Sequence, residues 1–131
     1  MFKKKTAGLV EPITLINGKN QITVLGKFDT GAQRTSIDKT LFEKLKLENI
    51  GEVEVSNVHG KSKRPLAELV LIIKGKRLAA RVNVADRSLR KFKVLIGRST
   101  IFNNFIVDIT KSHNSPLVGD LNESLRNWGK R

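Results

Sequence analysis

Apolar and polar residues alternate along much of the chain, which is the pattern of half-buried β-strands. Residues 11–28 hold two β-favouring runs around Asn17-Gly18, a dipeptide typical of tight hairpin turns. Residues 52–87 alternate again, with Gly60 and Gly75 near the middle of two further hairpin-like segments. The pattern therefore predicts short antiparallel strands joined by tight turns.

Helical spacing is scarce in the same region. Leu41, Phe42 and Leu45 recur at helical spacing behind Asp38, which is a candidate N-cap for one short helix. Residues 93–109 read as an apolar strand, a Gly-Arg break and a second apolar segment. The sequence predicts an all-β barrel or folded sheet over residues 11–109, with at most one or two short helices.

The two ends of the chain differ from this middle part. We expect an N-terminal extension over residues 1–10, whose lysine-rich start is frayed, and one domain over residues 11–110. In the tail, residues 111–131, Asp120 is a candidate cap for a short helix. That helix would have one apolar face, which needs the domain body or a second subunit as partner: Leu121, Leu125 and Trp128.

Length and composition restrict the class of protein. The chain has 131 residues, enough for one hydrophobic core, and no cysteine, which excludes thiol catalysis and fits a reducing, cytoplasmic location. The N-terminus has a basic start without an apolar signal region, and no run approaches the roughly 18 apolar residues of a spanning helix. We therefore expect a soluble, unexported protein without a membrane partner.

Charge widens the choice of partner. The chain has 25 Lys and Arg residues against 12 Asp and Glu residues, a formal net charge of +13. Such a field attracts nucleic acid, an anionic membrane or an acidic polypeptide. With 6 Phe, 1 Trp and no Tyr, a platform for stacking single-stranded bases is poorly supplied. Contact with a phosphate backbone stays possible.

One short motif carries candidate chemistry. Residues 29–32 read Asp-Thr-Gly-Ala directly after an apolar run, and alone this would be read as an ordinary Asx turn. Residues 94–98 then read Val-Leu-Ile-Gly-Arg. The two segments in this order, on a β background, resemble the retropepsin-like aspartic proteases. Together with residues 34–38, the region of Arg87 and residues 99–108, they look closest to the family labelled ATP-dependent zinc protease, retropepsin-like proteins associated with ATP-grasp glutamate ligases.

This resemblance implies a closed β-barrel with a hairpin flap and a two-fold homodimer. Two carboxylates must share a proton to hydrolyse an amide, and this chain has one such motif, so Asp29 of each subunit would meet its copy. Active-site loop roles carry over to Thr30, Gly31 and Ala32, and structural support to Thr35, Gly97 and Arg98. In many viral relatives an acidic residue follows the motif and pairs with that arginine; here the position is Gln33.

The flap would fall at residues 56–65, with Gly60 at or near its tip. This segment is far more basic than a viral flap, and a solvated basic hairpin end is an equally weighted interpretation. The candidate flap residues are His59, Gly60, Lys61, Lys63 and Arg64.

The sequence offers no support for either half of that family label. His59 and His113 are the only histidines and are far apart in sequence, and no HExxH pair is present, so we expect no metal site. No glycine-rich phosphate loop ending in Lys-Ser or Lys-Thr is present either, so we expect no cofactor.

Two functions remain open at this stage. The first is a homodimeric aspartic peptidase acting on acidic or glutamate-rich polypeptides. Its cleft would be made basic by Arg34 and the flap cations. The alternative is a non-catalytic basic β-barrel, which would present residues 61–64, 74–77 and 87–93 to nucleic acid or an acidic protein partner.

Overall fold

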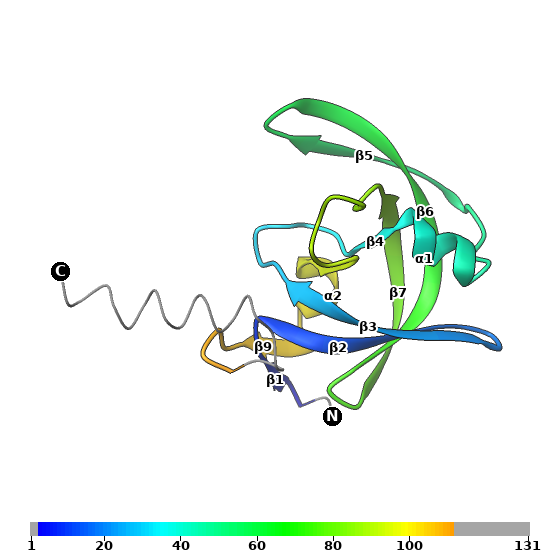
Figure 1. Ribbon diagram of the computed structural model, residues 1–131. Helices are drawn as coiled ribbons and strands as arrows, with labels where there is room; N and C mark the ends of the chain where they lie inside the picture. The colour runs from blue at the N-terminus through cyan, green and yellow to red at the C-terminus, as the bar shows by residue number, and fades with distance from the viewer. Residues whose placement is uncertain (1–2, 112–131) are drawn as a thin grey trace.

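The computed structural model of the chain describes residues 3–111, which form a β-barrel with a projecting hairpin (Figure 1). Two short helices accompany the strands, α1 at Lys39–Lys44 and α2 at Arg98–Ile101. The strands are β1 Lys5–Ala7, β2 Val10–Asn17, β3 Asn20–Phe28, β4 Ser36–Asp38, β5 Gly51–Asn57, β6 Gly60–Ile73, β7 Lys76–Ala85, β8 Val94–Ile96 and β9 Phe105–Val107.

Strand pairing closes the barrel. Seven strands form one sheet in the order β2-β3-β8-β4-β7-β6-β5, and β6 also pairs with β2, where Ile13 lies opposite Ile73. Every strand of that sheet except β5 therefore belongs to the closed ring. The expected all-β closed barrel with a hairpin and one or two short helices is confirmed.

The hairpin turns follow the local sequence. The turn between β2 and β3 contains Gly18 at a φ of 58°, and the turn between β6 and β7 contains Gly75 at a φ of 77°. Both angles lie in the left-handed region, which glycine adopts without a steric penalty. The two hairpins predicted around these glycines are confirmed.

The core lies inside the barrel and is filled by alternate residues of its strands. Within this core the rings of Phe28 and Phe105 pack edge to face, with centroids 5.4 Å apart and ring planes at 82°. Each fully buried aliphatic side chain contributes about 1.5–3 kcal/mol to stability relative to an exposed one. The fully buried aliphatic residues include Ile13, Leu15, Ile37, Leu71, Ile73 and Ile96.

The described ends of the chain pair with each other. Strands β1 and β9 form a separate parallel pair in which Lys5 lies opposite Phe105, and Ala7 is fully buried. The expectation of a frayed lysine-rich start is therefore wrong for Lys5, because its N–H donates to the carbonyl of Asn104 at 3.0 Å. The expected tail helix with its apolar face lies outside the described residues.

The predicted N-cap is confirmed. Asp38 has extended backbone angles, and its carboxylate accepts a hydrogen bond from the N–H of Thr40 at 3.1 Å. The side chain thereby satisfies one of the donors at the start of α1 that have no partner within the helix. Leu41 on this helix and Leu45 at its C-cap are buried against the barrel, as the spacing predicted.

Candidate functional site

The Asp-Thr-Gly-Ala motif forms a tight turn at the end of β3. The N–H of Asp29 donates to the carbonyl of Ile96 on β8 at 2.8 Å, which fixes where the turn begins. The Asp29 carboxylate accepts the N–H of Gly31 at 2.9 Å, and the carbonyl of Asp29 accepts the N–H of Ala32 at 3.2 Å. The half-buried carboxylate is thus oriented by the turn itself.

The second motif lies directly against this turn. The N–H of Arg98 donates to the carbonyl of Ala32 at 2.8 Å, and the N–H of Ser99 donates to the carbonyl of Gln33 at 2.9 Å. The guanidinium of Arg98 donates to the carbonyl of Thr30 at 3.0 Å. The side chain of Gln33 is not the partner of Arg98; a backbone oxygen takes the place of the missing carboxylate.

At Gly97 the backbone lies so close to the backbone of Arg34 that only glycine fits. A Cβ at this position would lie 2.4 Å from the carbonyl oxygen and 2.5 Å from the carbonyl carbon of Arg34. Real Cβ atoms do not approach backbone this closely, so any other residue would push the two loops apart. The glycine therefore allows the two motifs to pack.

A buried pair of hydroxyls ties the same loops together. Thr35 is fully buried, and its Oγ1 lies 2.5 Å from Oγ1 of Thr100. The N–H of Gly97 donates to Oγ1 of Thr35 at 3.1 Å. Hydrogen bonds in a buried site are costly to leave unmade, so these contacts hold the turn in one geometry.

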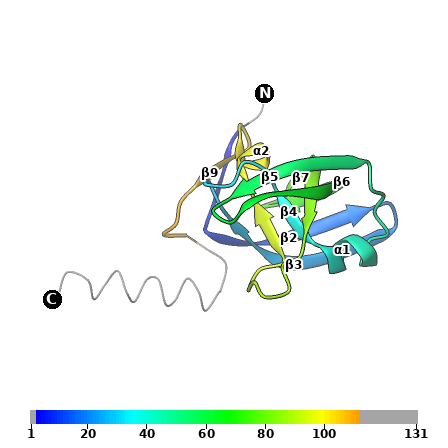
Figure 2. The ribbon, with the colours of Figure 1, turned by 90° about the horizontal axis from the view of Figure 1, so that it is seen from above.

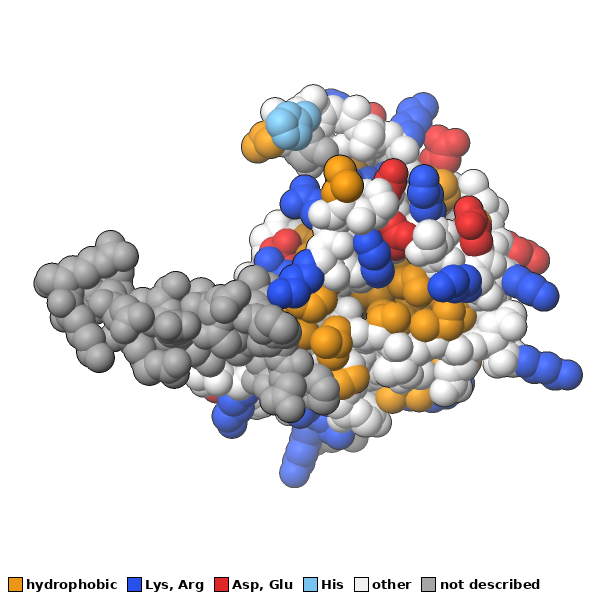
Figure 3. Space-filling view, in the orientation of Figure 1, with side chains coloured by type: hydrophobic (Ala, Val, Ile, Leu, Met, Phe, Trp, Pro, Cys, Tyr) orange, Lys and Arg blue, Asp and Glu red, His pale blue; other side chains and the backbone are white. Residues whose placement is uncertain are grey.

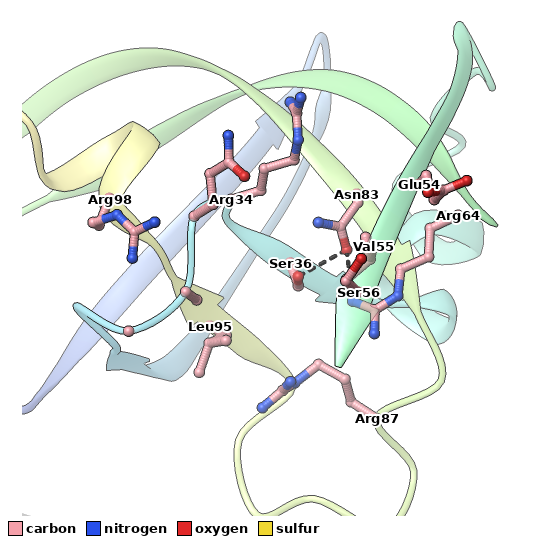
Figure 4. Close-up of a pocket in the computed structure, with 13 residues that line it drawn as sticks. Arg34, Ser36, Glu54, Val55, Ser56, Arg64, Asn83, Arg87, Leu95 and Arg98 are labelled. Carbon is pink, nitrogen blue, oxygen red and sulfur yellow. Dashed lines mark hydrogen bonds between the residues drawn. The ribbon is translucent and has the colours of Figure 1, made fainter. Parts of the chain in front are cut away.

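A cleft lies between this turn and the projecting hairpin. One hollow of about 400 Å³ lies beneath the hairpin (Figure 4), and a second of about 390 Å³ adjoins it, sharing Arg87 and Leu95. Asp29 lines the second hollow, together with Lys27, Arg90, Lys91 and Phe92. The first hollow is lined by residues 31–34, Ser36, Glu54, Val55, Ser56, Arg64, Asn83, Arg87, Leu95 and Arg98.

The predicted flap is a real hairpin that lies across the end of the barrel (Figure 2). Strand β5 pairs only with β6, and Val58, at the turn, is 96% exposed. Of the candidate flap residues, only Arg64 lines the cleft. Lys61 is exposed and lies 3.4 Å from Glu54; His59, Gly60 and Lys63 are exposed as well.

Arg87, in the loop between β7 and β8, is a cleft residue that sequence reasoning missed. Its N–H donates to the Asp38 carboxylate at 2.6 Å and its Nε to the carbonyl of Phe92 at 2.8 Å. Burial lowers the pKa of its guanidinium, and the charges of Arg90 and Arg64 lower it further, against the opposing effect of Asp38 and Asp29. The sequence analysis used the region of this arginine for the family resemblance and for a basic run, and gave the residue no role in the cleft.

Asn83 on β7 is a second missed residue. It is 2% exposed, and its Oδ1 accepts hydrogen bonds from Oγ of Ser36 at 2.7 Å and from Arg64 at 3.1 Å (Figure 4). A polar residue between Val82 and Val84 was the available signal, because a buried strand position rarely carries an amide without a partner.

Residues 3–111 contain no group of three or more His, Cys, Asp or Glu side chains placed to hold a metal ion. Within the same range, no helix has both the length and the apolar character needed to cross a membrane. Lysine and arginine side chains are prominent on the face below the hairpin (Figure 3).

Solved structures similar to this chain share its fold. The protein Lpg0085 of Legionella pneumophila, of unknown function (DUF785), matches with a TM-score of 0.62 and 24% identity over 86% of this chain and 98% of its own. The protease of Simian Foamy Virus (mac) matches with a TM-score of 0.52 and 16% identity over 70% of this chain and 90% of its own. The EIAV protease complexed with the inhibitor HBY-793 gives 0.53 and 18%, over 69% of this chain and 81% of its own.

These similarities to solved structures show the fold of the chain. The chain has the retropepsin-like fold, a closed barrel with a hairpin over one end. No protein-family model and no curated protein sequence matches it.

Proposed function

We propose that the chain is one subunit of a homodimeric aspartic peptidase in which Asp29 of each subunit activates the water. The observation that carries the proposal is the turn at residues 29–32, which is locked against residues 97–100 and places the Asp29 carboxylate beside a cleft. The fold shared with the two viral proteases supports the same function.

The chemistry requires two carboxylates that share one proton. One accepts a proton from water as its oxygen attacks the amide carbon, and the other donates a hydrogen bond to the carbonyl oxygen. The C–N bond then breaks and the amine leaves with a proton. Because each chain supplies a single such motif, a two-fold axis must bring the second Asp29 into the site. The pair titrates as a unit.

Charge favours an acidic substrate. Four arginines line the hollow beneath the hairpin, Arg34, Arg64, Arg87 and Arg98, whereas Glu54 is the single carboxylate in its wall. Together with the net charge of +13, they create a field that concentrates anionic chains at the cleft. We therefore propose acidic or glutamate-rich polypeptides as substrates.

Asp29→Asn tests the proposal because it keeps the shape of the side chain and removes only the ionisable group. We expect hydrolysis of a glutamate-rich peptide to fall by about a thousandfold or more, with an unchanged unfolding temperature and dimer content. Thr30→Ser is a matched control that leaves the carboxylate in place. Full turnover by a verified Asp29→Asn protein would exclude the shared-carboxylate mechanism.

Oligomeric state gives a second, independent test. We expect sedimentation of the active protein to show a dimer at tens of micromolar, a concentration typical of a modest interface. A monomer that is fully active would contradict the proposal. Salt-sensitive binding of RNA or DNA by a protein without peptidase activity would instead favour the basic binding module.

A further inference from the structure

The wall of the cleft beneath the hairpin contains a buried amide group that the proposed reaction does not use. Asn83 is 2% exposed and lies in the wall of the hollow of about 400 Å³. Its backbone N–H is already satisfied by the carbonyl of Thr35 at 3.0 Å. Its side chain is therefore the group available for recognition.

The contacts of Asn83 fix which way its amide faces. Arginine has only donors, so the atom that meets Arg64 at 3.1 Å must be the oxygen Oδ1. The same oxygen accepts from Ser36 at 2.7 Å. The nitrogen Nδ2 is directed away from Arg64 (Figure 4) and makes no hydrogen bond to any residue between 3 and 111. A buried donor of this kind calls for an acceptor.

Two guanidinium groups stand beside this amide. Arg64 on β6 and Arg87 line the same hollow, and Arg87 is anchored through its Nε on the carbonyl of Phe92 at 2.8 Å. The terminal nitrogens of Arg87 bond to no other residue of the described chain. The wall's carboxylate, Glu54, lies 3.4 Å from Lys61. Within the described chain neither Arg64 nor Arg87 forms an ion pair with a carboxylate, and Asp38 and Asp29 offset the charge of Arg87 only in part.

We propose that Asn83, whose amide is oriented by Arg64, forms with Arg87 a subsite that receives the carboxylate of one substrate side chain. A carboxylate presents two oxygens and accepts several hydrogen bonds at once, which matches an amide N–H and a guanidinium fork. Burial lowers the pKa of Arg87, and repulsion from Arg90 and Arg64 lowers it further; a substrate carboxylate beside Arg87 would relieve that repulsion. The inference rests on the proposed peptidase function and names the residues that select the substrate.

Asn83→Asp tests the subsite directly. The change keeps Oδ1 for Arg64 and Ser36 but replaces the Nδ2 donor by an oxygen that repels a carboxylate. For two peptides that differ by Glu against Gln at one position, we expect the ratio of kcat/KM values to fall about tenfold or more. Asn49→Asp is the matched control: it makes the same charge change outside the cleft, and its side-chain oxygen still accepts the N–H of Gly51.

A second variant guards against a folding defect at this buried position. Arg87→Met removes the guanidinium from a half-buried loop side chain, and we expect the same loss of preference between the two peptides. An unchanged preference in either variant, with native thermal unfolding, would overturn the subsite.

Binding in the absence of turnover separates the subsite from the peptidase. In the Asp29→Asn background, calorimetry with tri-glutamate and tri-glutamine should show tighter binding of tri-glutamate, lost on Asn83→Asp and kept on Asn49→Asp. That result would support the subsite even if the wild type hydrolyses nothing, in which case the proposed function alone fails. Equal binding of the two peptides would overturn the subsite and leave the peptidase intact.

Discussion

The turn that carries Asp29 and the hairpin that covers it are built in opposite ways. The turn is held by several elements at once: Ile96 on β8, the backbone of residues 97–99, and the buried Thr35 hydroxyl. The outer part of the hairpin, β5 with the start of β6, pairs only with itself and leaves most of its side chains exposed.

In the proposed peptidase, this contrast would separate two tasks in one cleft. A reacting carboxylate has to stand in one position, and buried hydrogen bonds from several strands provide that. A covering hairpin has to admit and release a chain, and exposed local pairing opens at lower cost in free energy than core pairing does. Substitutions should therefore cost far more stability at the turn than at the hairpin.

The largest effect is expected at Gly97. Gly97→Ala places a Cβ 2.4 Å from the Arg34 carbonyl oxygen, so the two loops must separate. We expect a loss of about 3 kcal/mol or more in the free energy of unfolding, measured by denaturant titration, and loss of any activity. The matching variant on the hairpin is Gly60→Ala. A Cβ at this position would have no atom within 4 Å, but Gly60 has a φ of 118°, so the variant should lose about 1–2 kcal/mol in the free energy of unfolding. Equal losses in the free energy of unfolding for the two variants would contradict the proposed difference between the turn and the hairpin.

A smaller effect is expected at Thr35. Thr35→Val keeps the shape of the side chain but removes the bonds to Thr100 and to the N–H of Gly97, so about 2 kcal/mol should be lost. Thr14→Val is the matched control, because Thr14 and Thr23 form the same kind of hydroxyl pair, at 2.9 Å, in an exposed place. That control should change stability by less than about 0.5 kcal/mol. A larger loss for Thr14→Val would contradict the argument.

The next effect is the pH dependence of stability set by Asp38, the last residue of β4. Burial raises the pKa of Asp38, but hydrogen bonds from Thr40 and Arg87 outweigh it and hold the pKa below the ordinary aspartate value. A lowered folded-state pKa gives stability above the unfolded pKa that is lost as pH falls through the folded pKa.

We therefore expect the thermal midpoint of the wild type to fall below about pH 4, and Asp38→Asn to weaken that dependence. The variant should be less stable at neutral pH by about 1–2 kcal/mol, because its amide NH₂ cannot accept a hydrogen bond. Glu52→Gln on the hairpin reports the effect of removing one exposed carboxylate. A pH profile of Asp38→Asn identical to that of the wild type would be the contradicting result.

The smallest change in stability is expected on the outer hairpin. Lys61→Glu combined with Lys63→Glu should alter the free energy of unfolding by less than about 0.5 kcal/mol. These lysines do not line the cleft, so they act through the long-range field, and their contribution to a preference for acidic peptides should vanish at high salt. The contribution of Asn83 should persist there. Loss of both contributions at the same salt concentration would show that they share one origin.

Much of this framework could be predicted from short-range sequence signals. The turns at Gly18 and Gly75 and the short helix capped by Asp38 follow from local chemistry. The contact between residues 29–32 and 97–100 was anticipated only through the paired motifs, since hydrogen bonds between distant loops leave no periodic trace.

Other features could not be predicted, for identifiable reasons. The partner of Arg98 is the Thr30 carbonyl, and every residue has a carbonyl, so nothing in the sequence marks it. The parallel pairing of β1 with β9 joins two three-residue strands too short to show alternation. The direction of the side chains on the flap could have been predicted from the sequence and was overlooked. Strand alternation places Lys61 and Lys63 on one face and Arg64 on the other.

The pairing of β1 with β9 also bears on how the chain is made. Strand β1 is synthesised before every other described strand, yet its partner β9 follows them all. Ala7 and the Phe105 ring cannot reach their buried positions until nearly all of the described chain has been synthesised. While residues 3–111 are being synthesised, the growing barrel therefore keeps an unpaired edge that is exposed to chaperones and to other nascent chains, and the pairing of β1 with β9 is the last among the described strands to become available.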